Sequence, residues 1–209
     1  MRQSKRGLLL VISGPAGVGK GTVNGLLLKR RPDVVMSVSA TTRAPRPGEI
    51  DGVHYFFKTP DEFSAMVERG EFLEYMQVFQ KHSYGTPKAF VSEQLERGNH
   101  VILEIDVQGA RKVKEAFPDA VRIFLAPPSM ETLKDRLTKR GTETAEEIAR
   151  RTATAYTEMR DMPACDYIVV NDDLETAVLQ VEAIIEAERC RVAHNADTIN
   201  EFLGGIQSC

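Results

Sequence analysis

Cysteine is scarce in this sequence, and the cysteines present lack the spacing of a disulfide framework or a metal site. The 209 residues include three, Cys165, Cys190 and Cys209, and no pair follows the CxxC pattern. Neither a small disulfide-bonded domain nor a zinc site is therefore expected. Free thiols are typical of a reducing compartment, so we expect a cytoplasmic protein.

Long apolar runs and a strong net charge are absent as well. The apolar run at residues 8–12 follows Arg2, Lys5 and Arg6, but five residues are too few for the core of a signal peptide. A membrane span needs about 18 apolar residues. The formal net charge of -3 provides no basic field for a nucleic-acid backbone. We therefore expect neither a membrane nor a nucleic acid as a partner.

What the chain does contain is an alternation of short apolar runs and longer segments of helical character. The apolar runs are short and rich in β-branched residues, as buried strands are, and lie at residues 8–13, 101–107, 121–125 and 167–170. The helical segments lie at 21–29, 131–139, 146–160 and 174–191. This alternation predicts an α/β fold, with a parallel sheet and helices on both of its faces.

Three stretches depart from the alternation. Residues 37–85 are rich in aromatic residues, proline and glycine, and predict an inserted small domain with short strands. Residues 138–156 are charged and poor in large apolar groups, which is typical of a mobile lid. After residue 191, apolar residues with helical spacing leave a docking helix and a frayed end both open.

The first apolar run leads into a glycine-rich loop with the spacing G-x-x-x-x-G-K. Its residues are Gly14, Pro15, Ala16, Gly17, Val18, Gly19, Lys20, Gly21 and Thr22. Glycines allow backbone amides to turn inward around an anion, and the following helix presents its positive N-terminal end. Lys20 adds a charge for the β- and γ-phosphates. A strand, this loop and a helix in that order predict an ATP-binding P-loop.

One position of the loop departs from the usual motif. A serine or threonine that contacts Mg²⁺ normally follows the lysine, but here Gly21 stands there and Thr22 comes one residue later. Mg²⁺ tolerates a shell of phosphate oxygens and water, so we expect these to hold most of the ion. Thr22 and Asp106, which ends the apolar strand at 101–105, are candidates for contact through water. A helix cap is the alternative for Asp106.

A second anion site is predicted in the insertion. Arg43 and Arg46 lie three residues apart in a segment stiffened by prolines, which suits bidentate binding of one phosphate. Hydroxyls from Tyr55 and Tyr84 are candidates to complete the cage. On these residues alone, a solvated basic turn is the alternative.

Taken in order, these pieces closely resemble the guanylate kinase family over about residues 7–190. The likeness is carried by the segments GPAGVGKGT, SVSATTRAPRPGE, DGVHYFF, GEFLEY, YGTP, LEIDVQG, FLAPPS, RLTKRGTET and IVVNDD. It implies a P-loop NTPase-like core of parallel strands flanked by helices. The expected division of the chain is a core at 1–36, 89–137 and 157–192, a GMP-binding insertion at 37–88, a mobile helical lid on the ATP side at 138–156, and a tail at 193–209.

The resemblance also implies an acceptor site for GMP. The positions that match those holding or recognising GMP are Ser39, Arg43, Arg46, Tyr55, Glu74, Tyr84, Thr86 and Asp106. Guanine presents the donors N1–H and N2–H₂ side by side, and a carboxylate such as Glu74 accepts both. Adenine lacks this pair, so a buried Glu74 facing AMP is badly matched. The resemblance therefore implies selectivity for GMP.

On the ATP side the resemblance adds Arg136, Arg140, Arg151 and Asn171. Arg140 and Arg151 are expected to reach the triphosphate and the transferring group, with Arg136 as a further candidate. Asn171 matches a position that contacts adenine. On the residues alone, an exposed helix with Glu/Arg pairs is the alternative for the arginines. Glu104 matches a further acidic position of the family, without a defined role.

The implied reaction is the reversible, Mg²⁺-dependent transfer of a phosphoryl group from ATP to GMP, which gives ADP and GDP in purine nucleotide metabolism. Such a transfer needs in-line positioning and neutralisation of negative charge, a catalytic role that falls to Lys20, Arg43, Arg140 and Arg151. The alternatives are a noncatalytic guanylate-kinase-like binding module and a different nucleoside monophosphate kinase. The sequence indicates no oligomeric state.

Overall fold

The computed structural model describes residues 6–78, 82–138 and 145–206 of the chain. In chain order its elements are β1 (Leu9–Ser13), α1 (Lys20–Arg30), β2 (Val34–Met36), β3 (Ala40–Thr41), β4 (Phe56–Phe57), α2 (Pro60–Glu68), β5 (Phe72–Val78), β6 (His82–Pro87), α3 (Lys88–Glu96), β7 (His100–Glu104), α4 (Val107–Ala116), β8 (Val121–Ala126), α5 (Met130–Thr138), α6 (Ala145–Met159), η1 (Met162–Ala164), β9 (Tyr167–Val170), α7 (Leu174–Arg189), η2 (Val192–Asn195) and α8 (Ala196–Ile206). The strands form one sheet of five and one of four.

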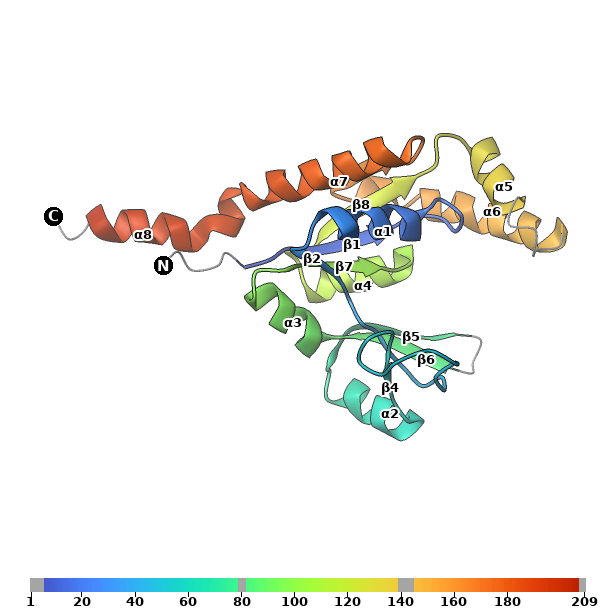
Figure 1. The fold of residues 1–209 in the computed structure, drawn as a ribbon, viewed down its shortest axis with the longest axis horizontal. Coiled ribbons are helices and arrows are strands. Elements are labelled where there is room, and N and C mark those ends of the chain that lie inside the picture. Colours follow the sequence, from blue (N-terminus) through green and yellow to red (C-terminus); the bar gives the residue numbers. More distant parts are fainter. Residues whose placement is uncertain (1–5, 79–81, 139–144, 207–209) are drawn as a thin grey trace.

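β1 lies at the centre of the five-stranded core sheet. The strand order is β2-β7-β1-β8-β9, and every adjacent pair is parallel. Because side chains of a strand alternate between its faces, Leu10 and Ile12 pack against α1 and α7, whereas Leu9 and Val11 pack against α3 and α4. Figure 1 shows these two helix layers above and below the sheet. The predicted α/β fold with a parallel sheet is confirmed.

The four-stranded sheet, ordered β4-β3-β6-β5, lies within the segment expected to be an insertion and packs against α2. Its apolar cluster joins Ala40 of β3, Phe63 of α2 and Phe72 of β5. The sequence pattern predicted short strands here but not α2. A signal was present, because Thr59 and Glu62 form a capping box in which each side chain accepts from the backbone N–H of the other.

Strand β7 ends earlier than predicted. The apolar run at 101–107 predicted one continuous strand, but β7 stops at Glu104 and α4 begins at Val107. Asp106 is the N-cap of α4, and its Oδ1 accepts from the N–H of Gly109 over 2.8 Å. This cap satisfies an N–H group that a helix start otherwise leaves unpaired. The acidic residue at the strand end is therefore Glu104, not Asp106. Helices α3 and α4 were not among the predicted helices.

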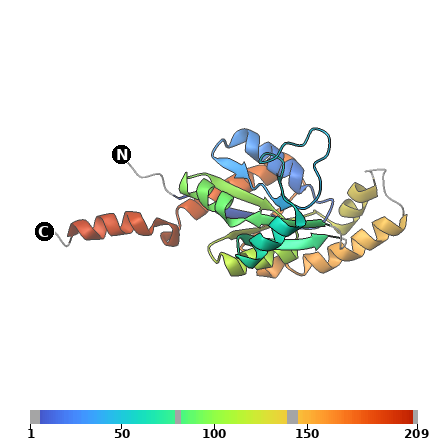
Figure 2. The ribbon, with the colours of Figure 1, turned by 90° about the horizontal axis from the view of Figure 1, so that it is seen from below.

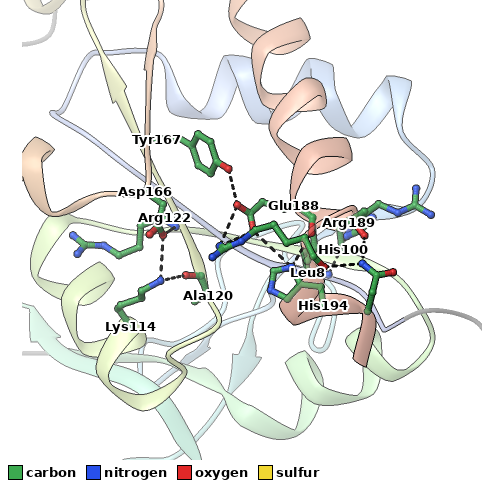
Figure 3. A network of polar contacts seen from close by, with 12 residues as sticks. Leu8, His100, Lys114, Ala120, Arg122, Asp166, Tyr167, Glu188, Arg189 and His194 are labelled. Carbon is green, nitrogen blue, oxygen red and sulfur yellow. Dashed lines mark hydrogen bonds and ion pairs between the residues drawn. The ribbon is translucent and has the colours of Figure 1, made fainter. Parts of the chain in front are cut away.

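The C-terminal helix α8 extends away from the body of the protein (Figures 1 and 2). It packs against η2 at its base. Phe202 and Leu203 are 75% and 54% exposed, so the tail is helical but leaves these two apolar side chains unburied. The buried carboxylate of Glu188 anchors this region: it accepts from the hydroxyl of Tyr167 over 2.6 Å and from Arg191, and the Glu188 carbonyl contacts His194 (Figure 3).

Candidate active site

The glycine-rich loop lies between the central strand of the core sheet and α1. β1 ends at Ser13 and α1 begins at Lys20, so the loop lies at the carboxyl edge of the parallel strands, where α/β proteins bind ligands. Gly19 has a φ of 100°, and a Cβ there would lie 2.5 Å from Nδ2 of Asn171, so this position requires glycine. Nζ of Lys20 donates to the carbonyl of Gly14 over 2.5 Å, which holds the ammonium group against the loop.

Arg136 and Asn171 come together beside the loop. Nη2 of Arg136 donates to the carbonyl of Asn171 over 2.9 Å, and Nδ2 of Asn171 donates to the carbonyl of Val18 over 2.8 Å. A hollow of about 370 Å³ opens here, lined by Gly17, Gly19, Thr22, Arg136, Asn171, Asp172 and Leu174. Among these, Asp172 and Leu174 were not predicted; their position directly after the last core strand was the available signal.

Glu104 faces the position where the loop has glycine instead of serine or threonine. Its carboxylate oxygens lie 3.8 and 3.9 Å from the place of a Cβ at Gly21. Oε2 of Glu104 also accepts from Nδ2 of Asn24 over 2.8 Å. In the described part of the chain, the buried Oδ1 of Asn24 has no hydrogen-bond partner, so this corner of the loop has one unsatisfied oxygen. Carboxylate and amide oxygens are suitable partners for a hydrated Mg²⁺ ion.

Asp106 was predicted to share that role, with a helix cap as the alternative, and its Oδ1 does cap α4. Within the described ranges, no group of three His, Cys, Asp or Glu residues could hold a metal. The residues therefore fit an ion that is held mainly by nucleotide phosphates and water, with Glu104 as the nearest acidic side chain beside Gly21.

Several residues predicted to form a phosphate cage in the insertion lie together around Arg43. Its guanidinium carbon lies 5.4 Å from the ring centroid of Tyr55, and the rings of Tyr55 and Tyr84 are 6.0 Å apart in an edge-to-face arrangement. Nη2 of Arg43 donates to Oε1 of Glu49 over 2.8 Å, and the backbone N–H of Arg46 donates to Oε2 over 2.7 Å. Glu49, which the sequence pattern did not single out, therefore joins both arginine positions. The Arg46 residue itself is exposed.

Glu74 and Thr86 form the deepest polar contact of the insertion. Glu74 is 8% exposed, and its Oε1 accepts from the Thr86 hydroxyl over 2.8 Å. Burial raises the pKa of the Glu74 carboxyl above its ordinary value, the Thr86 hydrogen bond opposes this, and the charge of Asp106 adds to it. The carboxylates of Asp106 and Glu74 therefore lie close enough to interact electrostatically. Ser39 directly precedes β3, and its carbonyl accepts from the N–H of Phe56 over 2.9 Å.

The lid prediction is only partly covered by the structure. Arg140 lies outside the described residues, and Arg151 lies on α6 with a partly buried side chain. The same helix carries Glu158, which the sequence pattern did not single out. Burial raises the pKa of the Glu158 carboxyl, the charge of Lys20 lowers it, and Asp106 raises it. The end of α6 therefore lies next to the glycine-rich loop.

By sequence and by fold, this chain is similar to guanylate kinases. The family model described as guanylate kinase matches residues 6–188. A guanylate kinase of Caldanaerobacter subterraneus subsp. tengcongensis is 54% identical over 197 residues, which cover 94% of this chain and 95% of the relative. One of Symbiobacterium thermophilum is 47% identical over 203 residues, or 97% and 96% of the two chains. The crystal structure of guanylate kinase from Anaplasma phagocytophilum is 33% identical, covers 95% of each chain and has a TM-score of 0.71.

Proposed function

Because the chain belongs to the guanylate kinase family, we propose that it transfers the γ-phosphoryl group of ATP to GMP, reversibly giving ADP and GDP, with Mg²⁺ as cofactor. The observation that carries the choice of acceptor is the buried carboxylate of Glu74 beside the Thr86 hydroxyl. ATP and GMP are the partners this function requires. A reducing compartment such as the cytoplasm fits the free thiols of Cys165 and Cys190.

Glu74 recognises the guanine base. Its carboxylate is buried in the insertion, so the N1–H and N2–H₂ donors of guanine compensate for water that the group has lost. Adenine offers no such pair of donors and leaves the carboxylate unsatisfied, which is costly in a buried site. The Thr86 hydroxyl, already bound to Oε1, fixes the orientation of the carboxylate. Ser39 and Asp106 complete the base pocket.

Arg43, Arg46, Tyr55 and Tyr84 bind the phosphate of GMP. The Arg43 guanidinium lies over the Tyr55 ring, and the contact of Tyr55 with Tyr84 places two phenols next to this cation. A guanidinium and phenolic hydroxyls both donate to phosphate oxygens. The acceptor oxygen is already an anion, so the reaction requires no general base.

The glycine-rich loop and the lid bind ATP. Backbone amides of residues 14–19 and the N-terminal end of α1 hold the β- and γ-phosphates, and Lys20 neutralises charge on them. Arg136 and Asn171 line the hollow for the adenosine part. When bound, Mg²⁺ would neutralise charge on the phosphates, with Glu104 as the acidic side chain near the ion. Arg140 and Arg151 stabilise the transferring group.

A nucleotide panel tests this function. Purified protein is given Mg²⁺ and ATP with GMP, AMP, UMP or CMP in turn, and ADP formation is measured. We expect strong turnover with GMP alone. Absence of turnover with every acceptor would point to a noncatalytic binding module, and preference for another acceptor to a different monophosphate kinase. Either result contradicts the proposal.

A further inference from the structure

The point where the lid helix α6 joins the core contains a buried ionic cluster that the function described above does not use. α6 ends at Met159, and the side chain of Asp161 follows with 1% exposure. Its two carboxylate oxygens accept from different arginines: Oδ1 from Nε of Arg111 and Oδ2 from Nη2 of Arg122, each over 2.5 Å. A buried carboxylate is stable only when it is paired in this manner.

The two arginines have different positions. Arg122 lies in β8 and is buried, and its Nη1 also donates to the carbonyl of Ala164 over 2.9 Å. It therefore attaches the junction to the core sheet. Arg111 lies on α4, and its side chain is 59% exposed. Removal of Arg111 would leave Asp161 paired with Arg122, so the junction can be altered without leaving a buried charge unpaired.

Helix α4 and the base of the lid are also packed together. Val107, the first residue of α4, belongs to an apolar cluster with Phe124, and Met159 and Met162 pack against this cluster. The residue before Val107 is Asp106. Its charge raises the pKa of two other carboxyls, that of Glu74 in the acceptor pocket and that of Glu158 beside the glycine-rich loop. Arg111 thus joins α4, which contacts strand β5 of the insertion, to the base of the helix that carries Arg151.

We propose that Arg111 is a positioning residue of the kinase reaction, which acts through Asp161 on the direction in which α6 leaves the core. This inference rests on the proposed function. Arg151 lies eight residues before the end of α6, or about 12 Å along the helix axis. A tilt of about 10° at the base would therefore move Arg151 by about 2 Å, and even a 1 Å misplacement of a reacting group can cost about a hundredfold in rate.

The first test compares Arg111→Ala with the wild type. We expect kcat to fall about tenfold, because the lid arginine is displaced in the transition state, while KM for ATP and for the acceptor changes less than about twofold. The melting temperature should be nearly unchanged, because the Arg122–Asp161 pair remains. Glu115→Ala, which removes an exposed charge from the same helix, is the matched control and should leave kcat unchanged.

A double-mutant cycle separates positioning from a general structural effect. If Arg111 acts through Arg151, Arg111→Ala should cause little further loss of kcat in an Arg151→Ala background. Additive losses, an unchanged kcat in the single variant, or a loss confined to KM would each overturn the inference.

The comparison is made with whichever nucleoside monophosphate the wild type phosphorylates. Turnover of an acceptor other than GMP then contradicts the proposed function alone. Normal GMP turnover by the wild type, together with an unchanged kcat in Arg111→Ala, contradicts the inference alone. A wild-type protein without any turnover contradicts both.

Discussion

Glu74 and Thr86 stand directly opposite each other in the antiparallel pair of β5 and β6, and the Thr86 hydroxyl donates to Oε1 of Glu74 over 2.8 Å. The two residues are twelve positions apart in the chain, and the pairing of β5 with β6 brings them together. A carboxylate fixed in this way presents its remaining acceptor sites in one direction. In the proposed function, acceptor choice therefore depends on the register of a single strand pair.

Substitution of Glu74 by glutamine should reduce the preference for GMP. Glutamine keeps the shape of the side chain but offers one acceptor oxygen and adds a donor that faces the donors of guanine. We expect kcat/KM for GMP to fall about a hundredfold, with KM for ATP nearly unchanged. Steady-state kinetics with GMP and AMP measures this. Glu71→Gln, at an exposed position that pairs with Arg69, is the control; an equal loss of ATP affinity in Glu74→Gln would contradict a role in base recognition.

The Glu74→Gln substitution should also change how the stability of the protein depends on pH. Burial raises the pKa of the Glu74 carboxyl, so the folded protein holds this proton more tightly than the unfolded chain does. Stability therefore falls as pH rises through the raised pKa, and the cost of ionised Glu74 is greatest at neutral and higher pH. We expect Glu74→Gln to raise the melting temperature at pH 8 by about 3 °C, or about 1 kcal/mol.

Near pH 4, where Glu74 is largely protonated in both states, the difference should nearly disappear. Thermal denaturation at the two pH values tests the sign. Glu71→Gln should produce no gain at either pH, because the hydrogen bond from Arg69 lowers the pKa of Glu71. If Glu74→Gln melts at a higher temperature than the wild type at pH 4 but not at pH 8, the predicted direction of the pH dependence is wrong.

Lys20→Ala should reduce turnover far more than acceptor binding. Nζ of Lys20 is held at the carbonyl of Gly14, inside the loop where the β- and γ-phosphates bind, and it stabilises charge that develops during transfer. We expect kcat to fall by about 10²- to 10³-fold, whereas GMP affinity measured by calorimetry stays within about twofold. Lys29→Ala, at the other end of α1, serves as the control. An unchanged kcat in Lys20→Ala is incompatible with a role for the loop in transfer.

Glu104→Gln should weaken the contribution of the protein to Mg²⁺ binding. Because Glu104 lies beside Gly21, loss of its charge should lower the affinity of the ATP-bound protein for Mn²⁺, a paramagnetic substitute for Mg²⁺, about tenfold. Paramagnetic resonance of bound Mn²⁺ measures this without turnover. Asp106→Asn is the comparison, and it should leave Mn²⁺ affinity nearly unchanged.

A second variant, Gly21→Ser, introduces the hydroxyl that the usual P-loop motif has at this position. A Cβ at this position meets only the Glu104 oxygens at ordinary contact distance, so the substitution should be tolerated. We expect it to recover part of the Mn²⁺ affinity in a Glu104→Gln background. If Asp106→Asn had the larger effect on Mn²⁺, the assignment of Glu104 would be wrong.

The loop and four of the five core strands could be predicted because their signals are local, whereas β2, with only three residues, was not predicted. Gly14 and Gly19 follow an apolar run and precede a helix, and each of these patterns is contained in a few neighbouring residues. The strand predicted at 167–170 coincides with β9 for the same reason, but β9 is an edge strand in which Ile168 and Val170 are exposed, not a buried strand as expected. Buried parallel strands have apolar residues on both faces and are therefore conspicuous in a sequence.

The parts that were missed depend on contacts across the fold. Ile105 and Val107 continue the apolar pattern of β7, but the cap formed by Asp106 starts a helix there. The strand therefore ends two residues earlier than Asp106, and the acidic residue at its end is Glu104. Glu158 acquires its place beside the glycine-rich loop only because α6 returns to the core. No spacing in the sequence predicts such a contact.

The insertion has its own sheet and its own apolar cluster of Ala40, Phe63 and Phe72, but Leu73 of β5 belongs to the core cluster that contains Leu9 and Val11. Changes in volume are felt mainly by side chains in direct contact. Substitutions in the cluster of Ala40, Phe63 and Phe72 should therefore leave the packing beneath the loop intact, whereas a change of volume at Leu73 should reach the core. In evolutionary terms, acceptor preference in this architecture can drift while phosphate binding is inherited unchanged.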